Sequence, residues 1–159
     1  MIIVLEGPDA TGKSTLADVI ARYTGYRVCP SEGPEKYEGE INDRVRRYMN
    51  NSSENTVFDR HPCVSQPIYA PHRNGEAVTR NLIELFYGLN PFFIYCRPTD
   101  LVVEHLIKEH DTPQHIEMLK LRGADIAKAY DEWALDHANF IYRIGDSHMA
   151  ILHAIGGLK

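Results

Sequence analysis

The segment with the clearest chemical signature is a short glycine-containing stretch near the amino terminus. Residues 7–14 match the phosphate-binding pattern GxxxxGK[ST] at every specified position. In this pattern the backbone amides, here those of residues 8–14, surround the β-phosphate of a nucleotide. The lysine adds a positive charge on the β and γ oxygens, and the hydroxyl reaches Mg²⁺. The sequence therefore predicts binding of a nucleoside triphosphate, with Lys13 and Ser14 in these two roles.

A second short segment, Asp59-Arg60, follows an apolar run and also suits phosphate chemistry. A carboxylate at the end of a strand is typical of the acidic partner of a P-loop, so we expect Asp59 near Mg²⁺ or its bound water. Arg60 is placed to bridge the donor and acceptor phosphates, where charge develops during transfer. We therefore predict Lys13, Asp59 and Arg60 as catalytic residues, and Ser14 and Asp59 as the residues at the metal.

The elements that must position these residues can be read from the surrounding pattern. Residues 1–5 are apolar and suit a buried parallel strand that leads into the loop. After the loop, apolar residues recur at helical spacing as far as Gly25 and predict an amphipathic helix: Leu16, Val19, Ile20 and Tyr23. Strand, loop and helix in this order place the loop at the positive end of a helix dipole.

Strands and helices alternate along the rest of the chain, which is typical of a parallel α/β sheet. We predict a five-stranded parallel sheet flanked by helices in three α/β/α layers. The predicted strands are residues 2–5, 26–29, 56–59, 91–96 and 139–144. Apolar stripes predict a helix around residues 41–49, a second around 78–89 with Leu85 and Leu89 on its apolar side, and a third over 114–137. Ser147 is predicted to cap a final helix that runs through Ile155.

Length and composition are typical of a soluble globular protein. The chain of 159 residues predicts a single domain over 1–159, with 43% apolar and 25% charged residues. A net charge of −5 disfavours a broad nucleic-acid surface, and we expect no nucleic-acid partner. Cys29, Cys63 and Cys96 have no metal-binding spacing and indicate free thiols in a reducing compartment. No apolar stretch approaches the ~18 residues of a membrane span, so we predict a cytoplasmic location.

Two segments poor in apolar residues are predicted to border the ligand, because loops at the carboxyl ends of parallel strands surround it. Residues 30–40 follow the second strand and are expected to form the wall on the acceptor side. Residues 108–113 are expected to form a short lid over the triphosphate. The basic residues and histidines available for this lid are Lys108, His110, His115, Lys120 and Arg122.

Residues 5–15 resemble the P-loop of thymidylate kinases, whose signature is E-G-x-D-x-x-G-K-S-T. Asp59-Arg60-His61, with the later Ser65, Pro67 and Tyr69, is similar to the D-R-[YH] segment of the same family. The resemblance implies a P-loop kinase core with Mg-ATP as donor and a deoxynucleoside monophosphate as acceptor. It also implies that Asp9 holds the sugar 3′-hydroxyl and that Arg60 holds the acceptor phosphate. The residues that we assign to ATP, from the motif, the predicted lid and this resemblance together, are Gly7, Pro8, Asp9, Ala10, Thr11, Gly12, Lys13, Ser14, Thr15, Arg122, Gly145 and Asp146.

Several further side chains are candidates for binding the acceptor. Arg44 flanks the apolar stripe of its helix, whereas Arg47 points further outward, so we expect Arg44 to bind a phosphate. Arg73 and Arg80 border the segment after Asp59-Arg60 and are further candidates. Tyr69 or Tyr37 would supply an aromatic face for a base. The chain is short between the second and third strands, where thymidylate kinases carry the helix that reads thymine, so the base remains open.

The leading interpretation is a kinase that converts a deoxynucleoside monophosphate to a diphosphate. The alternative is a deoxynucleoside kinase, whose hydroxyl acceptor needs a carboxylate base. Glu32 lies where related deoxynucleoside kinases keep that base. A nucleotide-dependent switch is less favoured, since base-reading motifs such as N-K-x-D are absent from the sequence. Whether the chain forms a homodimer is left open.

Overall fold

The sheet has five parallel strands, and the strand that leads into the glycine-containing loop lies between two others. The computed structural model describes residues 1–51, 55–73, 75–100, 106–108 and 111–157. The strands are β1 (Ile2–Glu6), β2 (Arg27–Cys29), β3 (Thr56–Asp59), β4 (Phe92–Cys96) and β5 (Phe140–Tyr142). Their order across the sheet is β2-β3-β1-β4-β5, and every neighbouring pair is parallel. The prediction of a five-stranded parallel sheet is therefore confirmed.

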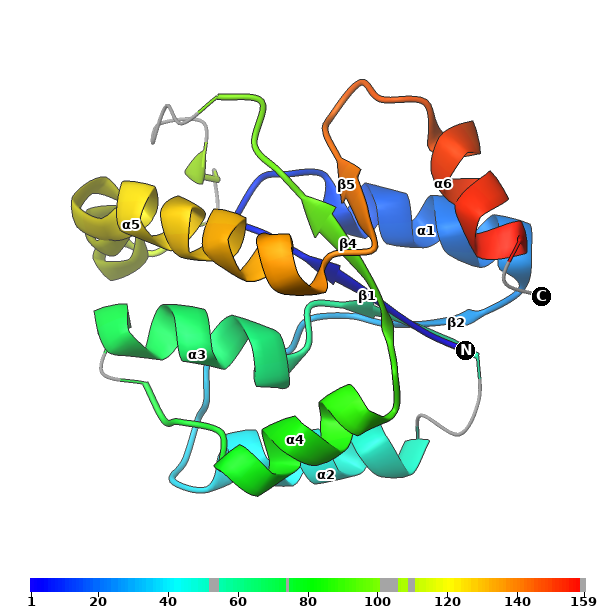
Figure 1. Ribbon diagram of the computed structural model, residues 1–159. Coiled ribbons are helices and arrows are strands. Elements are labelled where there is room, and N and C mark those ends of the chain that lie inside the picture. The colour runs from blue at the N-terminus through cyan, green and yellow to red at the C-terminus, as the bar shows by residue number, and fades with distance from the viewer. Residues whose placement is uncertain (52–54, 74, 101–105, 109–110, 158–159) are drawn as a thin grey trace.

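Helices cover both faces of this sheet (Figure 1). They are α1 (Lys13–Thr24), α2 (Glu40–Asn51), α3 (Pro62–Arg73), α4 (Arg80–Gly88), α5 (Pro113–His137) and α6 (His148–Gly156). One face packs against α1 and α6 and the other against α2 to α5, which gives the predicted three layers. Within the described ranges, no helix combines the length and the apolar character that crossing a membrane requires.

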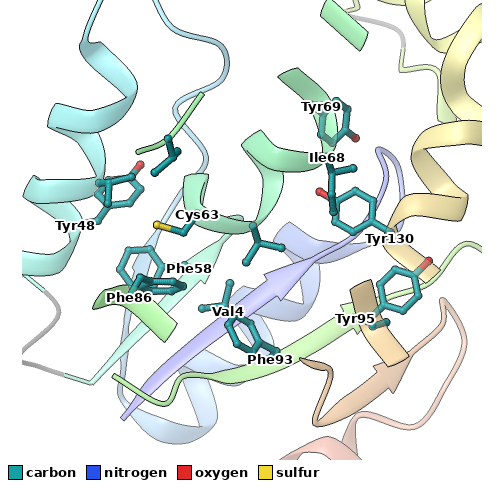
Figure 2. Packing of buried hydrophobic residues seen from close by; sticks show 14 of the residues in the cluster. Val4, Tyr48, Phe58, Cys63, Ile68, Tyr69, Phe86, Phe93, Tyr95 and Tyr130 are labelled. Atoms are coloured by element: carbon teal, nitrogen blue, oxygen red, sulfur yellow. The ribbon is translucent and has the colours of Figure 1, made fainter. Parts of the chain in front are cut away.

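The two cores follow from the alternation of side chains along the strands. Ile3 and Leu5 of β1 face the cluster that includes α1 and α6, whereas Ile2 and Val4 face the opposite cluster. Figure 2 shows this second core, where Val4, Phe58 and Phe93 of the sheet lie beneath aromatic and aliphatic side chains of the helices. Because both faces are covered, the central strands are apolar almost throughout.

One helix was not predicted from the sequence. Residues 62–73 contain Pro67 and Pro71, yet they form α3. Proline removes a backbone donor and crowds the preceding turn, so it argues against a helix interior. Burial of Val64, Ile68 and Tyr69 in the second core offsets that cost. Tertiary packing therefore overrides the local preference.

The apolar stripes predicted the helices correctly, but some of the residues assigned to those stripes are exposed. Leu85 and Leu89 were assigned to the apolar side of the helix predicted around residues 78–89, which corresponds to α4, but they are 60% and 46% exposed. Tyr23 at the end of α1 is likewise exposed. The cap of α6 is confirmed, because the Ser147 hydroxyl accepts a hydrogen bond from the amide of Met149 at 3.3 Å.

The strand order brings the two chemically distinctive segments together. β1 lies between β3 and β4, so the loop that follows β1 emerges at a point where the order of strands reverses. In the register of the sheet, Leu5 pairs with Asp59. The P-loop after β1 and the Asp59-Arg60 turn after β3 consequently leave the sheet at the same edge.

Candidate functional site

The P-loop is held in a tight conformation that two glycines make accessible. Gly7 has φ 143°, and Gly12, at φ 77°, is the N-cap of α1. The first amides of α1 therefore lie at the end of the loop, as phosphate binding requires. The Lys13 side chain is buried, and its ammonium donates hydrogen bonds to the carbonyl of Pro8 and, at 3.0 Å, to Thr11 Oγ1. Burial and the Arg60 guanidinium lower the pKa of Lys13 to about 8.

Gly7→Ala is expected to destabilise the protein well beyond the effect of left-handed strain alone. A Cβ at Gly7 would lie 2.2 Å from the carbonyl oxygen of Cys96, which belongs to the neighbouring strand. Gly25→Ala is the matched control, because Gly25 also has positive φ but has open space around its Cβ position. The control should cost about 1–2 kcal/mol of unfolding free energy, and Gly7→Ala clearly more. Urea unfolding of both variants measures the difference, and equal losses would contradict the close approach to β4.

The Asp59-Arg60 turn faces the start of α1. The Ser14 hydroxyl donates to Asp59 Oδ2 at 2.5 Å. A hydroxyl and a carboxylate oxygen are the hard donors that Mg²⁺ prefers, so this pair fits the metal predicted from the sequence. Arg60 adopts φ 70°, which is uncommon for a residue with a side chain. Its guanidinium lies 5.0 Å from the ring centroid of Tyr69, within the range of a cation–π contact.

Asp9 of the P-loop is the point where several cationic groups converge. Arg60 Nη2 donates to Asp9 Oδ1 at 3.0 Å, and the Tyr69 hydroxyl donates to Oδ2 at 3.1 Å. Lys108 Nζ lies 3.8 Å from Oδ1, and His115 Nε2 lies 3.5 Å from Oδ2. Burial alone raises the pKa of Asp9, but the Arg60 guanidinium and the His115 ring outweigh it and hold that pKa well below its usual range. The same contact raises the pKa of His115.

A single cavity of about 760 Å³ joins the P-loop to the segment predicted to bind the acceptor. Its wall includes Glu32, Arg44 and Tyr69, together with Lys13 and Asp59. The structure thus brings the predicted donor side and the predicted acceptor side into one space. The volume lies within the range of pockets that hold small molecules.

Arg44 is held firmly at the side of this cavity where the acceptor is predicted to bind. It is 3% exposed and donates to the carbonyl of Gly33 and to Glu40 Oε1, both at 2.6 Å. Its Nε lies 3.6 Å from Glu32 Oε2. Arg47 points outward, as predicted, and its exposed side chain pairs with Glu32 at 3.1 Å.

Other predicted residues lie away from the cavity wall. Arg122 is exposed, pairs with Asp125 at 3.6 Å and does not line the cavity. Arg80 is exposed and pairs with Glu84. Gly145 and Asp146 form a turn in which Asp146 accepts a hydrogen bond from the amide of Arg143, although the neighbouring Ile144 lines the cavity. Tyr37 is also exposed. The side chain of Arg73 and all of His110 lie outside the described residues.

One buried acidic residue of the site was not predicted. Glu6 is 0% exposed at the end of β1, and both of its carboxylate oxygens accept hydrogen bonds. The sequence signal was a single carboxylate that ends an apolar strand directly before the P-loop. Burial raises the pKa of Glu6 to about 7, although the Arg60 guanidinium opposes this shift.

Comparisons with known proteins agree with this geometry. Residues 3–64 match the model of the ATPase family associated with various cellular activities (AAA), which is less than half of the chain. No curated protein sequence matches the chain significantly.

Solved structures resemble the whole chain. The YorR protein of Bacillus subtilis in complex with phosphorylated GDP has a TM-score of 0.71 at 18% identity, covering 99% of this chain and 95% of that chain. Deoxyadenosine kinase from M. mycoides with the products dCMP and a flexible dCDP bound has a TM-score of 0.61 at 16% identity, covering 100% of both chains. Shikimate kinase from Acinetobacter baumannii in complex with shikimate has a TM-score of 0.61 at 17% identity, covering 99% of this chain and 93% of that chain. The chain therefore carries a P-loop motif and has the fold of the P-loop kinases.

Proposed function

We propose that this protein transfers the γ-phosphoryl group of Mg-ATP to the 5′-phosphate of a deoxynucleoside monophosphate. The observation that carries the proposal is the single cavity that runs from Lys13 of the P-loop to Arg44 on the acceptor side. A transferase needs both substrates in one space with the reacting groups in line, and a protein that only binds a nucleotide does not.

On the donor side, the amides of the P-loop and the Lys13 ammonium would bind the β- and γ-phosphates. Ser14 and Asp59 would hold the magnesium ion, since their oxygens already lie together at the start of α1. When bound, Mg²⁺ neutralises charge on the phosphate oxygens. The role of the chain is to position the phosphates and to keep cationic groups where charge develops.

On the acceptor side, an oxygen of the monophosphate forms the new bond to the γ-phosphorus. The bond from that phosphorus to the β–γ bridging oxygen breaks, and ADP leaves with the electron pair. An ionised phosphate needs no base to remove a proton, so this reaction requires positive charge near the acceptor and no general base. Arg60 and Arg44, which both line the cavity, supply that charge.

The sequence resemblance to thymidylate kinases supports a deoxynucleotide acceptor and favours thymidylate. The likeness to the deoxyadenosine kinase with dCMP and dCDP, at 16% identity, supports the fold alone. Tyr69 borders the cavity, but its side chain is buried and Arg60 lies over its ring, so the ring supports Arg60 and does not stack on a base.

A deoxynucleoside kinase is the second candidate, and Glu32 is the observation in its favour. The Glu32 carboxylate lines the same cavity, with its side chain 40% exposed, and accepts a hydrogen bond from the Tyr48 hydroxyl at 2.9 Å. A hydroxyl acceptor needs such a carboxylate to take its proton.

An ADP-release assay with ATP, Mg²⁺ and a panel of nucleosides and their 5′-monophosphates separates the two candidates. Turnover of a deoxynucleoside monophosphate without turnover of nucleosides supports the proposal. Phosphorylation of free thymidine or another nucleoside, with no monophosphate consumed, would assign the general-base role to Glu32 instead.

Asp9→Ala is expected to abolish discrimination between a deoxynucleotide and its 2′,3′-dideoxy analogue. If Asp9 accepts a hydrogen bond from the 3′-hydroxyl, that contact is worth ~1.5–3 kcal/mol, or about tenfold to a hundredfold in kcat/KM. Because Asp9 also pairs with Arg60, the substitution will lower activity with both substrates, so the ratio between them is the informative quantity. A wild-type enzyme that uses both substrates equally would show that Asp9 does not read the sugar.

A further inference from the structure

Glu6 is a fully buried carboxylate that the proposed reaction does not use. Its Oε1 accepts a hydrogen bond from the backbone amide of His61 at 2.7 Å, and its Oε2 accepts one from the Tyr130 hydroxyl at 3.0 Å. A buried carboxylate is costly unless such bonds compensate for the lost water. An apolar residue would fit the end of a buried strand at lower cost, so the contacts of Glu6 call for a specific explanation.

The backbone beside the Glu6 contacts, at Arg60, has an unusual conformation. Arg60 has φ 70°, a left-handed conformation that costs roughly 1–2 kcal/mol in a residue with a Cβ. The amide of Arg60 donates to the carbonyl of Leu5 at 3.0 Å, and the next amide, that of His61, donates to Glu6. Two consecutive residues of β1 therefore hold the amides on both sides of the Arg60 α-carbon.

This backbone conformation determines where the Arg60 side chain lies. From the turn, the guanidinium reaches Asp9 of the P-loop at 3.0 Å and lies over the ring of Tyr69. An arginine released from the left-handed conformation would leave the sheet in a different direction, away from these partners. The hydrogen bond between His61 and Glu6 therefore lies at the backbone that sets the direction of the Arg60 side chain.

We infer that Glu6 is a positioning residue for phosphoryl transfer, which fixes the backbone of Arg60 so that its guanidinium faces the P-loop. The inference rests on the proposed function, in which Arg60 acts on the transferring phosphoryl group. Tyr130 of α5 donates a hydrogen bond to the second oxygen of Glu6, so α5 also holds this carboxylate in place.

Two substitutions at Glu6 separate the loss of its hydrogen bonds from the loss of its negative charge. In Glu6→Gln the amide oxygen can still accept from His61, and the amide nitrogen can donate to the Tyr130 oxygen. Glu6→Leu keeps similar volume but leaves the buried amide of His61 without an acceptor. We expect the kcat of Glu6→Gln to stay within about threefold of wild type. The kcat of Glu6→Leu should fall by about a hundredfold, because small misplacements of catalytic groups lower the rate that much. The KM for ATP should be unchanged in both variants.

Glu132 of α5 provides matched controls, because its side chain is 67% exposed. Glu132→Gln and Glu132→Leu should both keep the wild-type kcat. If Glu6→Leu does not fold, Tyr130→Phe takes its place in the test, since it removes one contact of Glu6 and leaves the carboxylate. Tyr130→Phe is then expected to lower kcat several-fold without changing KM for ATP.

Amide hydrogen exchange tests the inference without relying on catalysis. The amides of Arg60 and His61 should be protected from exchange in wild type and in Glu6→Gln, and should exchange rapidly in Glu6→Leu. If Glu6→Leu does not fold, these amides should exchange faster in Tyr130→Phe than in wild type. If the wild-type protein transfers phosphate to no acceptor, the proposed function fails, and the exchange data still decide whether Glu6 holds this turn. The inference would be overturned if folded Glu6→Leu kept these amides protected or kept the wild-type kcat, even with a lower melting temperature. The same two results in Tyr130→Phe would overturn it where that variant replaces Glu6→Leu.

Discussion

Lys13→Ala is expected to lower kcat for phosphoryl transfer by about 10²–10³-fold in a protein that remains folded. The Lys13 ammonium lies at the first residue of α1, within the loop proposed to hold the β- and γ-phosphates. Its bonds to the Pro8 carbonyl and Thr11 Oγ1 already fix its direction before any substrate binds. A cation held in this way stabilises charge in the transition state with little reorganisation, which is why its loss should appear in kcat.

Steady-state kinetics with saturating ATP and acceptor measure the Lys13 effect. Lys128→Ala is the control, because the Lys128 side chain is 76% exposed on α5 and forms an ion pair with Glu132 at 3.7 Å. Thermal unfolding followed by circular dichroism establishes that each variant is folded. Turnover at the wild-type rate in Lys13→Ala would remove the P-loop lysine from the mechanism.

Arg60→Ala is expected to reduce kcat by a similar factor of about 10²–10³. Arg60 is mostly buried, with its side chain 14% exposed, and its guanidinium lies between Asp9 and Tyr69 in the cavity wall. A guanidinium in this low-dielectric position acts strongly on charge that builds up during transfer. Arg60→Lys keeps the charge but loses the planar geometry, so we expect it to recover only part of the rate.

The matched control for Arg60 is Arg80→Ala, since the Arg80 side chain is 89% exposed on α4. Both kcat and KM for the acceptor are needed. A variant with normal kcat and a raised KM for the acceptor would show that Arg60 binds the ground state alone, contrary to the role proposed here.

The P-loop was predictable because its geometry is encoded by consecutive residues. The glycine at position 7 is required by the backbone of a neighbouring strand, and the lysine and serine follow at fixed positions of the loop and helix. The sheet was predictable for a related reason: its central strands β1 and β4 are buried on both faces, so their sequences are apolar almost throughout. The roles of Lys13, Asp59 and Arg60 in catalysis stay predictions.

The helix α3 shows where local signals fail. Pro67 and Pro71 each remove a helical hydrogen bond, and no helix was predicted over these residues. Which residues of a helix are buried also depends on its neighbours, so Leu85 was assigned to the core although it faces solvent. Both errors arise because packing against distant elements outweighs intrinsic propensity.

The sequence by itself determined the α/β class, the parallel sheet and the P-loop motif, because each is encoded in residues that are neighbours along the chain. Only the tertiary structure decided the partners of the charged residues. Glu6 meets the amide of a residue 55 positions away and the hydroxyl of one 124 positions away. Arg122, a lid candidate from its position along the chain, is not part of the cavity wall. The energies of buried charges depend on distance and burial in space, and no local pattern in the sequence records either quantity.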